Sequence, residues 1–161
     1  MALVILGAPP SVFEGGDLDS TASTLLRRQS AKLNQSFLKP TMFSEAVLDH
    51  FKNPRNAGEL PNADATVEVT NPVCGDILKL AIRREGNRVL EARFLCRGCT
   101  TAIACASYLT EQLLALPISD WKTITADSIS TALGDLPPAT KHGAQLASDA
   151  LRTLVRQLAT R

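Results

Sequence analysis

Alternation between apolar and polar residues on both sides of one turn is the feature that most limits the folds open to this chain. The turn is Glu85-Gly86-Asn87, and apolar residues recur at every second position before and after it. In chain order the alternating apolar residues are Val67, Val69, Leu78, Leu80, Ile82, Leu90, Ala92 and Phe94. A period of two residues is typical of a strand with one buried face, so the pattern predicts three antiparallel strands in a meander.

The other periodic segments predict helices. The first spans residues 43–51, after a candidate N-cap at Thr41, and Pro54 ends it; a short helix also opens at Thr125. The apolar face of the first helix is formed by Phe43, Val47, Leu48 and Phe51. Two longer faces follow the strands: Ala102, Ala106, Leu109 and Leu113, and then Leu146, Ala150, Leu154 and Leu158. Strands before helices favour an α+β fold, in which a three-stranded antiparallel sheet packs against several helices.

Length and charge limit the classes of function. A chain of 161 residues, 45% apolar and 20% charged, suits one domain and a tail. The formal net charge is +1 and no long basic run is present, which counts against nucleic acid and anionic membranes as partners. The apolar residues 1–6 are far fewer than the roughly 20 that a membrane span needs, so we expect no transmembrane segment.

Residues 1–41 show no sustained periodicity, so we expect a poorly ordered N-terminal extension before a folded domain at residues 42–161. Within it, residues 20–39 are basic, rich in Ser and Thr and free of acidic residues, as in an organelle transit peptide. The upstream acidic residues Glu14, Asp17 and Asp19 count against this, and a start at Met42 is equally consistent. The expected location is cytoplasmic, or the mitochondrial matrix if the extension is a transit peptide.

The four cysteines are Cys74, Cys96, Cys99 and Cys105. They lie close together in a chain without a secretory pattern, which favours a reducing compartment and metal or thiol chemistry over disulfides. The hairpin brings two of them together, because its first strand leaves the loop that carries Cys74 and its second strand returns just before Cys99. Pairing Arg83 with Arg88 would also place Asp76 opposite the last residues of the third strand.

These residues have the chemistry of a metal site. A helix that begins at Cys99 stabilises a thiolate through its unpaired N–H groups and its dipole. His142 falls near the start of the last helix, after Pro137-Pro138, and packing places it near the thiols. Thiolates with imidazole suit zinc or iron–sulfur chemistry, and a carboxylate such as Asp76 leaves the bound group more exchangeable. Cys74, Asp76, Cys99 and His142 are therefore the candidate ligands.

Each position also has a structural interpretation. Asp76 could cap a turn, and His142 could begin a helix without a ligand role. By alternation Cys96 lies on the buried face, so we expect core packing, with the role of a substitute ligand as the alternative. Cys105 lies on the buried face of its helix, and we expect it in the core.

The residues 43–58, FSEAVLDHFKNPRNAG, resemble the opening of the IscU/NifU N-terminal family of iron–sulfur cluster assembly scaffolds. The resemblance covers about residues 42–160. It continues through the motifs Cys74-Gly75-Asp76, Ala92-Arg93-Phe94, Gly98-Cys99, Ala102-Ile103-Ala104, Leu136-Pro137-Pro138, His142 and Leu146-Ala147-Ser148-Asp149-Ala150.

The resemblance implies a small α+β scaffold and not an enzyme. Such a scaffold receives sulfur from a cysteine desulfurase and iron from a donor, builds a [2Fe–2S] cluster and passes it to apo-proteins. It implies that Cys74 and Cys99 are cluster ligands and that Asp76 keeps the cluster transferable. His142 is implied to be a fourth ligand or the neighbour of one.

Two departures from the family pattern qualify these expectations. The family usually places a third ligand cysteine, the sulfur acceptor, where this chain has Gly143, and Cys96 is the candidate substitute. It also carries a lysine for chaperone recognition where this chain has Thr140, which counts against the chaperone and co-chaperone pair as partners. The alternatives are a SufU-like sulfurtransferase with zinc on Cys74, Asp76 and Cys99, or a regulatory member that no longer assembles clusters. The glycine counts against the sulfurtransferase, which needs the same third thiol.

Overall fold

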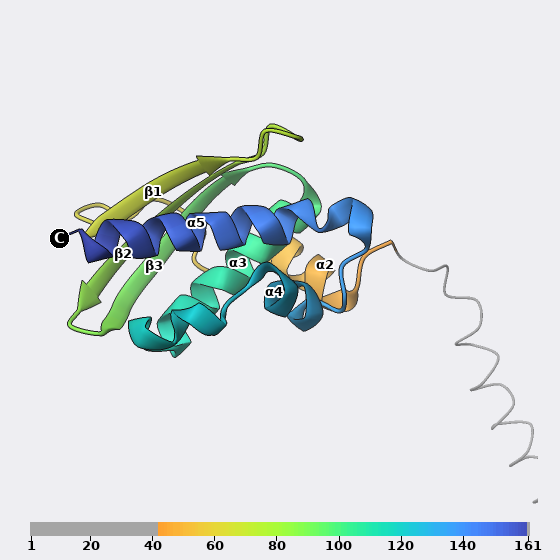
Figure 1. Ribbon diagram of the computed structural model, residues 1–161. Helices are drawn as coiled ribbons and strands as arrows, with labels where there is room; N and C mark the ends of the chain where they lie inside the picture. The colour runs from red at the N-terminus through yellow and green to blue at the C-terminus, as the bar shows by residue number, and fades with distance from the viewer. Residues whose placement is uncertain (1–41, 161) are drawn as a thin grey trace, which may run out of the picture. The chain divides into compact units, whose positions relative to one another are not determined.

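The computed structural model describes residues 42–160, and the extension expected at residues 1–41 lies outside the described residues. In chain order the elements are α2 (Glu45–Lys52), β1 (Ala65–Thr70), β2 (Ile77–Glu85), β3 (Arg88–Arg97), α3 (Thr100–Ala115), the 3-10 helix η1 (Ile118–Thr123), α4 (Ala126–Ala132), the 3-10 helix η2 (Pro138–Thr140) and α5 (His142–Ala159). This order confirms the predicted α+β fold (Figure 1). Within residues 42–160 no helix has the length and apolar character that crossing a membrane requires.

The sheet is the predicted antiparallel meander in the order β1-β2-β3. Its hairpin register differs from the expected one, since Arg88 pairs with Glu85 and Arg83 pairs with Glu91. A bulge between Arg83 and Arg84 accounts for part of this shift. At the other end of the hairpin Ile77 pairs with Arg97, so the chain leaves β3 directly opposite the loop before β2.

Because of the bulge, the predicted buried face of β3 is wrong at the start of the strand. Leu90 was expected to point into the core, but it is 59% exposed, while Val89 is buried in its place. The extra residue changes the alternation at this point, so that a single period cannot describe the whole strand. Beyond the bulge Ala92 and Phe94 point into the core as predicted.

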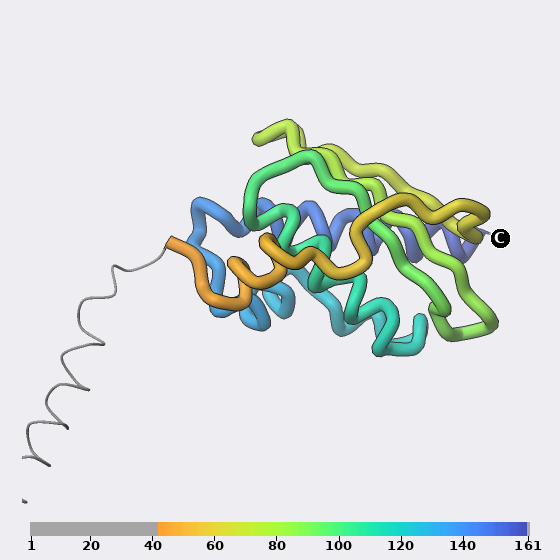
Figure 2. The backbone as a smooth tube through the Cα atoms, turned by 180° about the vertical axis from the view of Figure 1, so that it is seen from behind, coloured from red at the N-terminus to blue at the C-terminus, as the bar shows by residue number. Residues whose placement is uncertain are grey.

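Helices α3 and α5 pack on the sheet and enclose the core (Figures 1 and 2). Among the strands, α3 contacts mainly β3 and α5 contacts mainly β1, and the two helices also pack against each other. The buried faces of both helices are those predicted from helical spacing, with Leu158 partly buried at the end of α5. Both views place the first turn of α3 and the first turn of α5 at the same end of the molecule, next to the loop before β2.

Helix α2 begins two residues later than predicted, at Glu45. Its N-cap is Ser44, whose hydroxyl oxygen accepts from the backbone N–H of Val47 at 3.1 Å; Thr41 lies outside the described residues. The hydroxyl of Ser44 also donates to the backbone carbonyl of Leu133, which joins α2 to the end of α4. His50 is buried against α3, whereas Phe51, expected on the apolar face, is 39% exposed.

Candidate metal centre

The loop between β1 and β2 presents Cys74 on an exposed turn. The N–H of Gly75 donates to the carbonyl oxygen of Asn71 at 2.8 Å, and the N–H of Asn71 donates to the carbonyl oxygen of Asp76 at 2.8 Å. Gly75 has a φ of +73°, a left-handed conformation that favours glycine. The turn therefore holds the thiol at its tip and Asp76 at its base, where that residue is only 8% exposed.

Cys99 is the N-cap of α3, as the sequence predicted. Its Sγ accepts from the N–H of Ala102 at 3.4 Å and lies 3.1 Å from Oγ1 of Thr101. Its own N–H donates to Oδ2 of Asp76 at 3.4 Å. This bond connects the base of the Cys74 loop, which precedes β2, to the start of α3, which follows β3. The residues on both sides of the hairpin therefore form one site.

Gly98 allows this close approach. A Cβ atom on Gly98 would lie 2.8 Å from Cγ of Asp76 and 3.0 Å from its Oδ2. Such a contact is too short for any side chain at this position, so the carboxylate packs directly against the backbone of residue 98.

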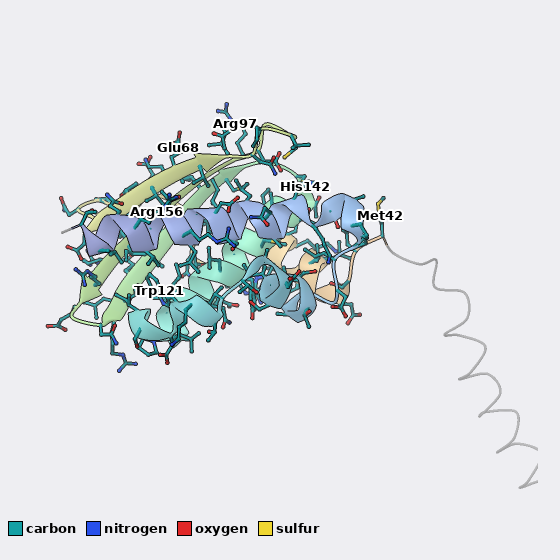
Figure 3. The ribbon with its side chains drawn as sticks, viewed as in Figure 1. Met42, Glu68, Arg97, Trp121, His142 and Arg156 are labelled. Atoms are coloured by element: carbon teal, nitrogen blue, oxygen red, sulfur yellow. The ribbon has the colours of Figure 1, made fainter. Side chains whose placement is uncertain are left out.

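His142 is the first residue of α5 (Figure 3). Its Nε2 lies 3.5 Å from Sγ of Cys99. One ligand atom each from Cys74, Asp76 and His142 lies within 4.8 Å of the other two. The structure thus brings together all four residues that the sequence singled out, including His142, which spacing alone could not place. Two thiols, a carboxylate and an imidazole are a donor set that suits iron–sulfur or zinc chemistry.

The four thiols differ in their surroundings. Desolvation raises the pKa of the exposed Cys74 thiol above its ordinary value; the backbone hydrogen bond from Asp76 opposes this, and the hydrogen bond that the thiol donates to the Asp76 carboxylate adds to it. Burial raises the pKa of Cys96 to about 12, with smaller contributions from Asp76 and the other thiols. Cys105 is fully buried in the core, as predicted, and burial raises its pKa to about 12. Cys96 faces Leu78 across the sheet and packs partly buried against the core.

Gly143 is buried where α5 crosses the first turn of α3. A Cβ atom on this residue would lie 2.8 Å from the backbone nitrogen of Ala102, 2.8 Å from the carbonyl carbon of Thr101 and 3.0 Å from its carbonyl oxygen. Backbone atoms of a helix cannot move aside as a flexible side chain can. The position therefore has no room for a cysteine side chain while the two helices keep this separation.

Gly98 and Thr101 are site residues that the sequence reasoning did not single out. Gly98 directly precedes Cys99, and this position was the only sequence signal for its role. Thr101 is one of two consecutive threonines that open α3, and nothing in the sequence distinguishes the one whose hydroxyl meets the sulfur.

Comparison with known proteins supports the family resemblance. The profile of the family described as NifU-like N terminal domain matches residues 42–161. The iron-sulfur cluster assembly scaffold protein IscU 1 of Archaeoglobus fulgidus is 42% identical over 114 residues, which are 71% of this chain and 74% of that protein. The iron-sulfur cluster assembly scaffold protein IscU of Escherichia coli is 38% identical over 117 residues, 70% of this chain and 91% of that protein.

Solved structures share the fold. The N-terminal part of a nitrogen-fixing NifU-like protein from Brucella abortus superposes with a TM-score of 0.61 at 16% identity, over 73% of this chain and 94% of that one. A putative iron-sulfur cluster assembly scaffold protein for the SUF system of Fervidobacterium islandicum superposes with a TM-score of 0.60 at 19% identity, over 71% and 96%. Because the family profile covers the whole described domain and relatives reach 42% identity, this chain belongs to the NifU-like N-terminal domain family.

Proposed function

We propose that this protein is an iron–sulfur cluster assembly scaffold, which binds iron and a labile [2Fe–2S] cluster and passes the cluster to apo-proteins. The observation that carries the proposal is the convergence of Cys74, Asp76, Cys99 and His142 from one loop and two helix starts. Relatives that share 38% and 42% of the aligned residues are named as scaffolds of this kind.

The chemistry of the site suits a cluster that is built and then released. Thiolates of Cys74 and Cys99 bind iron strongly, whereas the carboxylate of Asp76 is a harder ligand that stabilises a cluster less. Cys74 and Cys99 are both exposed, so a sulfur donor and a recipient protein can reach the metal. A scaffold needs this combination of affinity and access, while a permanent cofactor site is usually enclosed.

The partners that follow from this function are a cysteine desulfurase as the sulfur source and apo iron–sulfur proteins as recipients. Val73, beside Cys74, is 90% exposed and lies at the edge of a cavity of about 320 Å³ that His142 also lines. An exposed apolar residue next to a reactive thiol offers a contact for a protein that delivers or receives the cargo. The proposed location is the cytoplasm, or the mitochondrial matrix if residues 1–41 act as a transit peptide.

Anaerobic reconstitution with iron, sulfide and a cysteine desulfurase tests the proposal. We expect the wild type to acquire the absorption and circular dichroism of a [2Fe–2S] cluster, and Cys74→Ala to lose them. Cys105→Ala is the matched control, because it also removes a thiol, but one that is fully buried in the core. A Cys74→Ala protein with a normal cluster would reject the proposed ligand set.

The zinc-dependent sulfurtransferase is the less favoured function. It requires a thiol that accepts persulfide at the position of Gly143, where a Cβ atom would overlap the backbone of α3. Metal analysis of protein purified without oxygen separates the functions: iron with acid-labile sulfide for the scaffold, zinc alone for the sulfurtransferase, and neither for a regulatory protein. Zinc in aerobically purified protein does not decide between them, because open thiolate sites bind this metal during expression.

A further inference from the structure

The sulfur of Cys99 has three hydrogen-bonding neighbours in the structure. They are the N–H of Ala102 at 3.4 Å, Oγ1 of Thr101 at 3.1 Å and Nε2 of His142 at 3.5 Å. The hydroxyl of Thr101 is the nearest of the three. Thr101 is 1% exposed, and within residues 42–160 the Cys99 sulfur is the one hydrogen-bond partner of its hydroxyl. A buried hydroxyl normally has a partner, so this group is committed to the sulfur.

We infer that Thr101 is a positioning residue that tunes the bond between Cys99 and iron. This inference rests on the proposed scaffold function. When Cys99 is a thiolate ligand it can only accept, so the hydroxyl of Thr101 donates to it. A hydrogen bond to a ligand sulfur withdraws electron density from it, which raises the reduction potential of a cluster and weakens the iron–sulfur bond. Thr101 thus adds to the effect of Asp76 and keeps the cluster transferable.

The surroundings of Thr101 hold this hydrogen bond in place. The residue lies in the first turn of α3, where its backbone is covered by Gly143 of α5. A Cβ atom on Gly143 would come within 3.0 Å of the Thr101 carbonyl oxygen, so the glycine lets α5 seal this turn from water. The hydroxyl of Thr101 is therefore shielded from water on the side of the helix, although the Cys99 sulfur itself is exposed, so its hydrogen bond goes to the sulfur and not to solvent.

The inference also gives Gly143 a role. A cysteine at position 143 would add a third thiolate ligand. The glycine at this position instead allows α5 to pack closely over Thr101. The site then depends on fewer thiolates, and one of them is weakened by hydrogen bonds. Such a site is expected to release its cluster more readily than one with three unhindered thiolates.

The test compares Thr101→Val, which removes the hydroxyl at nearly constant shape, with Thr101→Ser, which keeps it. Both full-length proteins are reconstituted anaerobically, and two properties are measured: the midpoint reduction potential and the rate at which a chelator removes the cluster. We expect Thr101→Val to shift the potential to more negative values and to slow cluster removal several-fold, and Thr101→Ser to behave as the wild type.

Two controls separate tuning from simple structural damage. Thr110→Val removes another fully buried hydroxyl of α3, one that donates to the carbonyl oxygen of Ser107, and we expect it to leave the potential unchanged. Thr101→Ala replaces Thr101→Val if the valine protein does not fold. A hydroxyl-free variant with the potential and release rate of the wild type would overturn the inference. A wild type that binds no cluster would reject the proposed function itself, whatever the variants do.

Discussion

The imidazole Nε2 of His142 lies 3.5 Å from Sγ of Cys99, and this contact joins the first residue of α5 to the N-cap of α3. Both helices therefore direct their positive N-terminal ends toward one group of ligands. A cluster of the proposed kind, held by thiolates and a carboxylate, would carry negative charge, which the two helix N-termini would stabilise. The close crossing at Gly143 is what makes this arrangement possible.

Replacing Gly143 tests that crossing. Gly143→Ala and Gly143→Cys both add a Cβ atom 2.8 Å from backbone atoms of α3. We expect each to lower the free energy of unfolding by about 1–3 kcal/mol, since the overlap outweighs the better helix propensity of the new residue. Urea unfolding measures the loss. Gln145→Cys, on an exposed position of the same helix, should change the stability little.

The same variants show whether the missing thiol can be restored. If Gly143→Cys is as stable as the wild type and binds a longer-lived cluster, the helices separate more easily than the structure indicates. A destabilised Gly143→Cys with an unchanged cluster would agree with the geometry.

A second prediction concerns the glycine beside Asp76. In Gly98→Ala the new Cβ atom would lie 2.8 Å from Cγ of Asp76, so the carboxylate must move and its hydrogen bond from the N–H of Cys99 is lost. We expect slower removal of the cluster by a chelator, in the same direction as Asp76→Ala but smaller. Gly86→Ala is the control for cluster removal, because this glycine lies at the far end of the hairpin and no atom lies within 4 Å of the added Cβ; unlike Gly98 it has a positive φ, so its alanine variant strains only the turn. Faster removal from Gly98→Ala would contradict the prediction.

The sequence predicted the topology well because each element carries its own periodicity. Alternation identified the strands, and the four-residue spacing identified the buried faces of α3 and α5. The convergence of Cys74 and Cys99 followed from the meander alone. The bulge after Arg83 was not predictable, since one extra residue in a strand leaves the alternating pattern almost unchanged. For this reason Leu90 was predicted to be buried, whereas Val89 is the buried residue.

The tertiary contacts within the site could not be predicted from the sequence. Gly143 meets Thr101 and Ala102 only because α5 crosses α3, and the two segments are about forty residues apart in the chain. The sequence showed a glycine where a thiol was expected, but not that the space for the thiol is filled by backbone. Tertiary contacts of this kind have no periodic signal, and packing geometry alone determines them.

The contact between α2 and α3 provides a prediction about pH. Nδ1 of the buried His50 lies 2.9 Å from Oγ of Ser107, and that oxygen already accepts from the N–H of Arg55 at 2.8 Å. Nε2 of His50 faces Oε2 of Glu111 at 3.7 Å, which favours the neutral tautomer with its proton on Nε2, and Nδ1 then accepts from the hydroxyl of Ser107. Burial, followed by the charge of Arg55, lowers the pKa of His50 below its ordinary value of 6.5, although Glu111 opposes this.

The sign of the effect on stability follows from this direction. The unfolded chain binds the His50 proton more readily than the folded one, so the stabilisation by neutral His50 is complete above pH 6.5. It is lost as the pH falls through 6.5 toward the lower pKa of the folded state. Urea unfolding between about pH 7.5 and about pH 5 should show a steeper loss of stability in the wild type than in His50→Gln. An unchanged slope in His50→Gln would contradict the prediction.

The last prediction decides between the two roles considered for Cys96. Its side chain packs partly buried against the core opposite Leu78, and burial raises its pKa to about 12, so at neutral pH it is a protonated thiol. We expect Cys96→Ala to keep the cluster and its reduction potential, and to lose about 1 kcal/mol of stability from the small cavity it leaves. Cys74→Ala, measured in parallel, should lose the cluster and keep its stability, because this residue is exposed. The reverse pattern, in which Cys96→Ala unfolds normally but no longer binds a cluster, would identify Cys96 as the ligand that replaces the missing third sulfur.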